Sequence, residues 1–274
     1  MVSRISIAAA VSALCLSTTA LGQWSDGFEY ADGPLVGNGN WEIWYSGGSD
    51  GTVTSQRSHS GAKSLRLDHF SDCVQRYNID GGQWVFTAWT YMPNDAVSID
   101  GVTADGYLIL MNQYGGPDNW SMQVRFGFMD GLVESQFGAQ TLPLVIDQWV
   151  EFRAEIDLDA DLMDLYYGGQ PLAQGLLWSD NVSGAGLPQI RALDLYSSTV
   201  DGFFIDDVSL NPAAPPCPGD LDGDGDVDLS DLATLLSNFG TTGTATPEQG
   251  DSDGDLDVDL TDLAVLLGGF GSTC

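Results

Sequence analysis

The end of this 274-residue chain repeats one acidic phrase, and this repeat restricts the fold more than any other feature of the sequence. The segment from Gly219 to Gly240 recurs 31 residues later as Gly250 to Gly271, with 16 of the 22 aligned positions identical. Copies this close together are two examples of one supersecondary unit. The sequence therefore predicts a C-terminal module built from two similar halves.

Acidic residues in each copy are spaced like the ligands of a calcium-binding loop. With Asp220 as position 1, aspartates stand at 1, 3, 5, 9 and 12, and a backbone carbonyl is available at position 7. We therefore predict two Ca²⁺ ions, one in each copy. The predicted ligands are Asp220, Asp222, Asp224, Asp226, Asp228 and Asp231 in the first copy, and Asp251, Asp253, Asp255, Asp257, Asp259 and Asp262 in the second.

The two loops differ at position 6, where the chain turns sharply. Gly225 occupies this position in the first loop and Leu256 in the second. Glycine adopts a positive φ at no steric cost, whereas a side chain there is strained by about 1–2 kcal/mol. We expect Leu256 either to adopt a positive φ or to distort its loop, and in both cases to weaken the second site.

Each acidic loop is followed by an apolar pattern with helical spacing, which a disordered acidic tail would lack. The apolar residues are Leu229, Leu232, Leu235, Leu236 and Phe239 after the first loop, and Leu260, Leu263, Leu266, Leu267 and Phe270 after the second. The module is therefore predicted to be a duplicated calcium loop and helix.

This arrangement resembles a dockerin domain over residues 217–274. Dockerins are calcium-binding, EF-hand-like modules of secreted bacterial proteins, and the resemblance implies a cohesin-like partner. The family's recognition pair matches Leu229-Ser230 and Leu260-Thr261 here. The sequence departs from the family near the helix ends, where Ser237-Asn238 and Gly268-Gly269 replace the usual basic residues.

The N-terminus has the pattern of a secretory signal peptide. Arg4 precedes an apolar stretch from Ile5 to Leu16, and Ala20-Leu21-Gly22 forms a small-x-small cleavage site. Residues 1–22 are predicted to be removed, leaving a protein that is secreted or held at a bacterial cell surface. No other segment reaches the roughly 18 apolar residues of a membrane span, so no transmembrane segment is expected.

Charge and cysteines narrow the function further. The formal net charge is −31 at pH 7, and no Lys or Arg follows Arg191, which disfavours nucleic acid as a partner. Cys217 and Cys274 bracket the repeats and are predicted to form a disulfide, as suits an exported module. Cys73 is left over and is interpreted as a buried thiol on a strand.

Residues 23–210 are predicted to form a single antiparallel β-sandwich. Short alternating runs are separated by Gly, Asn and Asp, and no long helical pattern occurs. The clearest strand is Trp149 to Asp157, whose Val150, Phe152, Ala154 and Ile156 share one face. Residues 211–216, Asn-Pro-Ala-Ala-Pro-Pro, are predicted to be a stiff linker.

Several stretches of this region resemble concanavalin A-like and laminin-G-like sandwiches and carbohydrate-binding jelly rolls. The hairpin from Trp149 to Gly169 and the segments Ser58 to Leu65 and Phe203 to Leu210 carry the resemblance. Such jelly rolls often hold a structural calcium between their first and last strands. The resemblance makes Glu29, Asp206 and Asp207 the candidate ligands for a third ion.

The resemblance also raises the question of catalysis. Laminarinase-type hydrolases on related sandwiches carry a Glu-x-Asp-x-x-Glu strand, and Glu155 and Asp157 match its start, but Ala160 replaces the third acid. Retaining hydrolysis needs two carboxyl groups about 5–5.5 Å apart. For a polysaccharide lyase, His69 is the better of two histidines as an acid or base. These three residues remain weak catalytic candidates.

Aromatic residues in predicted loops favour sugar binding, because flat rings fit the apolar faces of sugars. The candidates are Trp41, Trp44, Tyr45, Tyr114, Trp120 and Trp178, with 111–121 as the best single loop. The leading hypothesis is non-catalytic recognition of a polysaccharide or other glycan by the sandwich. The alternatives are a glycoside hydrolase or lyase on the same fold, and a structural cell-surface protein that binds proteins.

Overall fold

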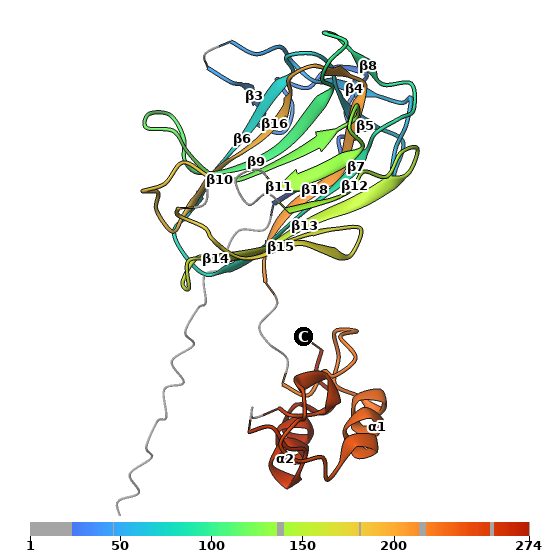
Figure 1. Ribbon diagram of the computed structural model, residues 1–274, viewed down its shortest axis with the longest axis vertical. Helices are drawn as coiled ribbons and strands as arrows, with labels where there is room; N and C mark the ends of the chain where they lie inside the picture. The colour runs from blue at the N-terminus through green and yellow to red at the C-terminus, as the bar shows by residue number, and fades with distance from the viewer. Residues whose placement is uncertain are drawn as a thin grey trace, which may run out of the picture. The chain divides into compact units, whose positions relative to one another are not determined.

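The computed structural model describes residues 24–45, 47–135, 140–180, 182–213, 218–252 and 255–273 (Figure 1). The chain divides into two compact units at the junction of Pro212 and Ala213. We call them the sandwich unit and the C-terminal unit. The predicted signal peptide and residues 214–216, the second half of the predicted linker, lie outside the described residues.

Two antiparallel sheets make up most of the sandwich unit. Sheet A contains β1 (Trp24–Asp26), β2 (Gly33–Pro34), β4 (Thr52–Thr54), β5 (Ser64–Leu67), β7 (Gln83–Tyr91), β13 (Trp149–Asp157), β14 (Leu162–Tyr167), β15 (Gln170–Leu177) and β18 (Phe203–Pro212). Sheet B contains β3 (Glu42–Ile43), β6 (Asp72–Ile79), β9 (Asp105–Gln113), β10 (Asn119–Gly127), β11 (Leu132–Ser135), β12 (Gln140–Pro143) and β16 (Ile190–Ser197). β8 (Val97–Ser98) and β17 (Val200–Asp201) form a small separate ribbon.

Strand order brings together segments that are distant in the sequence. Sheet A runs β15-β14-β13-β7-β18-β5-β4-β2, with β1 beside β18, and sheet B runs β12-β11-β10-β9-β16-β6-β3. In the described part of the chain, every pairing between these strands is antiparallel. The predicted antiparallel β-sandwich is therefore confirmed.

Alternation along the strands builds the core between the two sheets. In β13, Phe152, Ala154 and Ile156 are buried, as the sequence predicts, and they meet residues from sheet B. The ring of Phe126 on β10 lies 6.3 Å from that of Phe152 and 5.3 Å from that of Phe203 on β18. Bulky side chains from both sheets thus close one continuous hydrophobic core.

Two boundaries differ from the prediction. β18 continues through Pro212, so the first two residues of the predicted linker extend the last strand. The predicted loop 111–121 is mostly strand, because β9 ends at Gln113 and β10 begins at Asn119.

The C-terminal unit contains the two predicted helices, α1 (Leu229–Asn238) and α2 (Leu260–Gly269), and a short 3₁₀ helix, η1 (Pro247–Gln249). Each α-helix starts with a capping box made by two aspartates of the repeat, Asp228 with Asp231 and Asp259 with Asp262. A small core joins the halves and consists of Val227, Leu235, Ala245, Val258 and Leu266.

Candidate functional site

Cross-strand register lines up side chains on the face of sheet B that points away from the core. We call this surface the outer face of sheet B. Its members alternate along each strand with core residues such as Leu108 and Leu110. Pairing produces three rows: Gln123, Ile109, Asp194 and Val74; Arg125, Tyr107, Tyr196 and Asp72; and Trp120, Met111, Ala192 and Arg76.

An open pocket of about 450 Å³, the sheet B pocket, lies on this face. Its lining comes from β6, β9, β10, β16 and the residue after β3: Trp44, Asp72, Tyr107, Ile109, Trp120, Gln123, Asp194 and Tyr196. This volume lies within the usual range for small-ligand sites.

Aromatic rings make up much of the pocket wall. Trp44 and Trp120 are stacked with ring centroids 6.1 Å apart, and Tyr107 and Tyr196 are stacked at 5.7 Å. The Trp44 ring also lies 5.2 Å from Tyr45, so the aromatic surface continues beyond the pocket. Four of the predicted ligand residues therefore gather in one place: Trp44, Tyr45, Tyr114 and Trp120.

The floor of the pocket carries a pair of acids, Asp72 and Asp194, whose carboxyl groups are hydrogen-bonded to each other. Asp194 is only 4% exposed, and the Oδ1 atom of each acid is buried without a hydrogen-bond partner. Burial raises the pKa of Asp72 to about 6. Burial, together with the charge of Asp72, raises the pKa of Asp194 well above its usual value.

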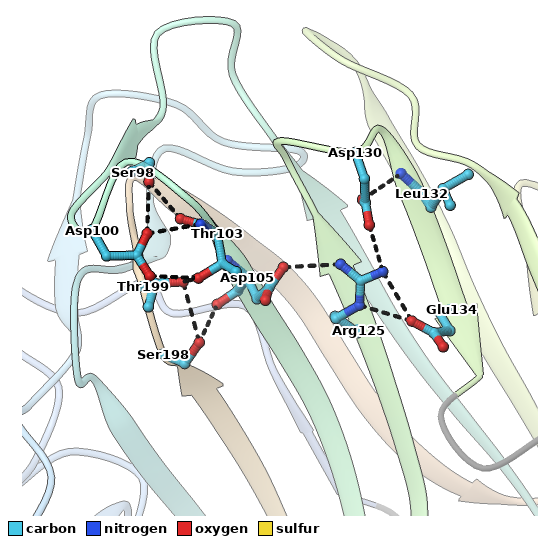
Figure 2. A network of polar contacts seen from close by, with 10 residues as sticks. All are labelled: Ser98, Asp100, Thr103, Asp105, Arg125, Asp130, Leu132, Glu134, Ser198 and Thr199. Carbon is cyan, nitrogen blue, oxygen red and sulfur yellow. Dashed lines mark hydrogen bonds and ion pairs between the residues drawn. The ribbon is translucent and has the colours of Figure 1, made fainter. Parts of the chain in front are cut away.

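Next to the pocket, Arg125 is surrounded by three carboxylates. Figure 2 shows its guanidinium between Asp105 on one side and Asp130 and Glu134 on the other, at 3.0, 2.7 and 2.9 Å. Burial lowers the pKa of Arg125, but hydrogen bonds to the three acids outweigh burial and raise it. Its positive charge is thus fully compensated within the protein.

Every other Lys and Arg in the described residues is also paired with an acid. Arg76 contacts Glu42 at 2.7 Å and lies over the ring of Tyr114 at 4.5 Å. The remaining pairs are Arg57–Asp95, Lys63–Asp32, Arg66–Asp68, Arg153–Glu155 and Arg191–Asp80. The described surface therefore has no uncompensated cation for an anionic ligand.

Two predicted ligand residues lie in the core. Trp41 is 3% exposed and donates its ring N–H to Asp26 at 2.8 Å. Trp178 is fully buried and donates to the carbonyl of Gln189 at 3.0 Å. The prediction that these two tryptophans face a ligand is wrong, because each is needed to fill the sandwich.

The weak catalytic candidates do not come together. Glu155 forms an ion pair with Arg153, and Asp157 accepts hydrogen bonds from Gln83 and from the backbone of Ala160. The bond from Ala160 is the main cause that lowers the pKa of Asp157. His69 lies elsewhere, with its backbone N–H bonded to Asp201. Glu155 and Asp157 thus serve local structural contacts, whereas the Nδ1 atom of His69 is buried without a hydrogen-bond partner.

The acids predicted to hold a third calcium instead hold a turn of the chain. Glu29 accepts hydrogen bonds from the backbone of Ala62 and Lys63, and Asp206 accepts one from His59. Asp207 bonds the His59 ring at 2.6 Å. In the described part of the chain, three groups of acids have oxygen atoms within 4.8 Å of one another and could hold a metal ion. Glu29, Asp206 and Asp207 do not form one of these groups.

The first repeat loop gathers its acids closely. Oxygens of Asp220, Asp222 and Asp224 lie within 4.8 Å of one another, as do those of Asp226, Asp228 and Asp231. Gly225, at the turn, has φ 91° and donates to Asp220 at 3.1 Å. The loop is thus folded around its acids, with oxygen-rich groups that suit a hard cation.

The second loop has the same plan with one strained residue. Asp257, Asp259 and Asp262 form a matching group, and Leu256 adopts φ 71°, as expected from its position. The Leu256 N–H donates to Asp251 at 3.0 Å, the counterpart of the Gly225 contact. Asp253 lies outside the described residues.

Of the cysteines, the structure describes Cys73, which is free and buried in the sandwich core. Burial raises the pKa of its thiol above the usual range, so it is an unreactive core residue. The predicted disulfide partners, Cys217 and Cys274, lie outside the described residues.

No family model matches this sequence, and no curated protein matches it. In the described residues, no helix is long and apolar enough to cross a membrane.

Several solved structures are similar in fold. A sialidase has a TM-score of 0.48 at 11% identity, covering 85% of this chain and 22% of the sialidase. The globular domain of Trypanosoma cruzi calreticulin has a TM-score of 0.43 at 12% identity, over 68% of this chain and 88% of that domain. The xylan-binding domain CBM22-1 of Paenibacillus barcinonensis Xyn10C has 0.39 at 14% identity, over 70% and 94%.

Proposed function

We propose that this chain is a secreted, non-catalytic carbohydrate-binding protein, with a jelly-roll sandwich that holds a glycan on the outer face of sheet B. The observation that carries the proposal is the cluster of Trp44, Tyr45, Tyr114 and Trp120 beside the sheet B pocket. Sugar rings stack on such aromatic surfaces, and polar side chains in the pocket fix their hydroxyl groups.

The test is binding of the full chain to a glycan array, followed by calorimetry and a reducing-sugar assay. We expect binding without turnover, and a loss of at least about tenfold in affinity for Trp120→Ala, which removes one stacking surface. Tyr166→Ala is the matched control, because Tyr166 lies on sheet A beneath Arg153. Turnover would support the hydrolase or lyase alternative instead, and an absence of glycan binding would favour the protein-binding alternative.

For the C-terminal unit, we propose two calcium ions in the repeat loops. Support comes from the gathered carboxylate groups and the turn at Gly225. At each site, calcium would be held by the aspartates of one loop, and its charge would offset the mutual repulsion of these acids. Removal of calcium with EDTA is expected to lower helix content.

A docking role for the same unit rests on a separate observation. Each helix, together with the residue that follows it, exposes a matching set of apolar side chains: Leu229, Leu236 and Phe239 are 70, 54 and 44% exposed, and Leu260, Leu267 and Phe270 are 71, 54 and 44% exposed. Apolar groups repeated on the surface are typical of protein-binding sites. Binding to purified cohesin domains, with Leu229→Ser and Leu260→Ser as variants, tests this role; unchanged binding by the double variant would contradict it.

A further inference from the structure

The sheet B pocket combines aromatic walls with buried acids, and this combination restricts the charge of its ligand. Asp194 sits between Ile109 and Val74 in one row, and Asp72 follows Tyr196 in the next, so the two acids are diagonal neighbours. Strand register therefore brings two carboxyl groups together on a surface whose nearest members are mostly aromatic or aliphatic.

The acid pair has no cation of its own. Arg125 is held by three carboxylates and Arg76 by Glu42, and the described residues offer no other base on this face. The two hydrogen-bonded carboxyl groups share a proton, and when this proton leaves, two like charges lie side by side in a poorly solvated place, which is unfavourable. A cation bound in the pocket would relieve this repulsion and would take the place of the shared proton.

The residues that line the pocket favour an organic cation over a metal ion. Calcium takes six to eight oxygen ligands, but most of this pocket is built from Trp44, Trp120, Tyr107, Tyr196 and Ile109. Aromatic rings instead attract ammonium groups through the negative charge of their faces. The pocket volume of about 450 Å³ also exceeds what a bare ion needs.

We propose that the sheet B pocket recognises an amino sugar with a free ammonium group, held between Asp72 and Asp194 while its ring stacks on the neighbouring aromatic side chains. The proposal rests on the proposed carbohydrate-binding function and names the class of glycan. A neutral sugar would leave the acid pair without a charge partner, and an anionic sugar would be repelled by it.

The experiment is calorimetry of the full chain with three oligosaccharides of equal length: chitosan, chitin and cellulose fragments. Measurements are made at about pH 6.5, above the pKa of about 6 that burial gives Asp72, so that this carboxyl group is largely ionised while much of the amine is still protonated. Excess calcium is present, so that the repeat loops are loaded. We expect chitosan fragments to bind at least about tenfold more tightly than the other two. Asp194→Asn, which keeps the shape of the side chain, is expected to abolish this preference. Asp95→Asn, at an acid that is 74% exposed and paired with Arg57, is the control and is expected to retain it.

Each other outcome overturns the inference in a distinguishable way. Equal binding of all three oligosaccharides would contradict it while leaving the carbohydrate-binding function intact. No binding of any of them would contradict the inference, and the glycan array would then decide whether the carbohydrate-binding function fails as well. A preference for chitosan that appears only without calcium, and that calcium abolishes both in the wild type and in a variant lacking Asp231 and Asp262, would show that a metal ion occupies the pocket. A preference that survives in Asp194→Asn would show that the ammonium group binds elsewhere.

Discussion

At the scale of single residues, a carboxyl group buried against a second carboxyl group costs the folded protein free energy. The pKa of Asp72 is raised to about 6 by burial, and that of Asp194 is raised still more clearly. The folded protein therefore keeps protons that the unfolded chain releases near pH 4. The stability contributed by the pair is full below that pH and is lost as the pH rises through about 6.

Asp194→Asn removes one ionisable group from this pair and is expected to flatten the pH dependence of stability. In the wild type, the free energy of unfolding is expected to fall between pH 4 and pH 7. In Asp194→Asn this fall should be smaller by about 1 kcal/mol, after allowance for the partial exposure of Asp72. Urea unfolding at both pH values measures it. Asp206, whose pKa burial also raises to about 6, is common to both proteins and cancels in the comparison. An unchanged pH dependence would mean that the pair ionises as freely in the folded protein as in water.

Leu256 shows strain at a single backbone position in the C-terminal unit, where φ is 71°. Leu256→Gly should remove a strain of about 1–2 kcal/mol and tighten the second calcium site roughly fivefold to thirtyfold. The mirror variant Gly225→Leu should weaken the first site by a similar factor. Two-site calorimetry of the full chain checks both, and equal affinities in the wild type would show that the loop tolerates leucine without strain.

At the scale of strands and helices, the sequence reveals local patterns well but reveals little about which distant strands pair. β13 has the predicted bounds, and β14 lies within the predicted hairpin from Trp149 to Gly169, because alternation and a tight turn are local signals. The sequence reveals only part of the pocket: Trp44 and Trp120, with Tyr114 beside them, stand out as aromatic residues near predicted turns. Asp72, Asp194, Tyr107 and Tyr196 were missed, because they become neighbours only when β16 lies between β6 and β9. Their only local signal was an outward position on an alternating strand.

The packing of β9 against β18 gives a test at this scale. A Cβ atom on Gly106 would approach the Phe203 ring to 2.3 Å, and Phe203 is fully buried. Gly106→Ala should therefore force the ring to move and lower the free energy of unfolding by about 1–3 kcal/mol. Urea unfolding followed by tryptophan fluorescence measures the change. Gly268→Ala, where a Cβ meets nothing within 4 Å, should leave this transition in place; an equally small effect of Gly106→Ala would show that the core adjusts freely.

At the scale of the whole molecule, the two units can be followed separately because they give different spectroscopic signals. All eight tryptophans precede Ala213, whereas the two α-helices of the described chain lie in the C-terminal unit. The sequence predicts both helices, because the apolar spacing of the repeat is a local signal. The sequence does not predict the order of the sixteen strands in the two sheets, because this order depends on which distant strands pair.

Calcium is expected to act on one unit alone. EDTA should reduce the helical circular dichroism signal of the full chain and lower the midpoint temperature of its first thermal transition. The transition of the sandwich unit, followed by tryptophan fluorescence, should stay unchanged. Calcium at a hundred times its dissociation constant should contribute about 2.7 kcal/mol per site. A shift of the fluorescence transition by EDTA would instead reveal a calcium ion in the sandwich and would revive the role predicted for Glu29, Asp206 and Asp207.

The two halves of the C-terminal unit hold each other's loops. Val227 of the first loop exchanges backbone hydrogen bonds with Gly271 and Ser272 after α2, and Val258 of the second loop does so with Gly240 and Thr241 after α1. Because of this exchange, deletion of one half would leave backbone donors and acceptors of the other half without their partners. The carbonyl of Leu256 also accepts a hydrogen bond at 3.2 Å from the backbone N–H of Ala245, which lies outside the second loop. Contacts from outside the loop thus hold its shape around a leucine at positive φ.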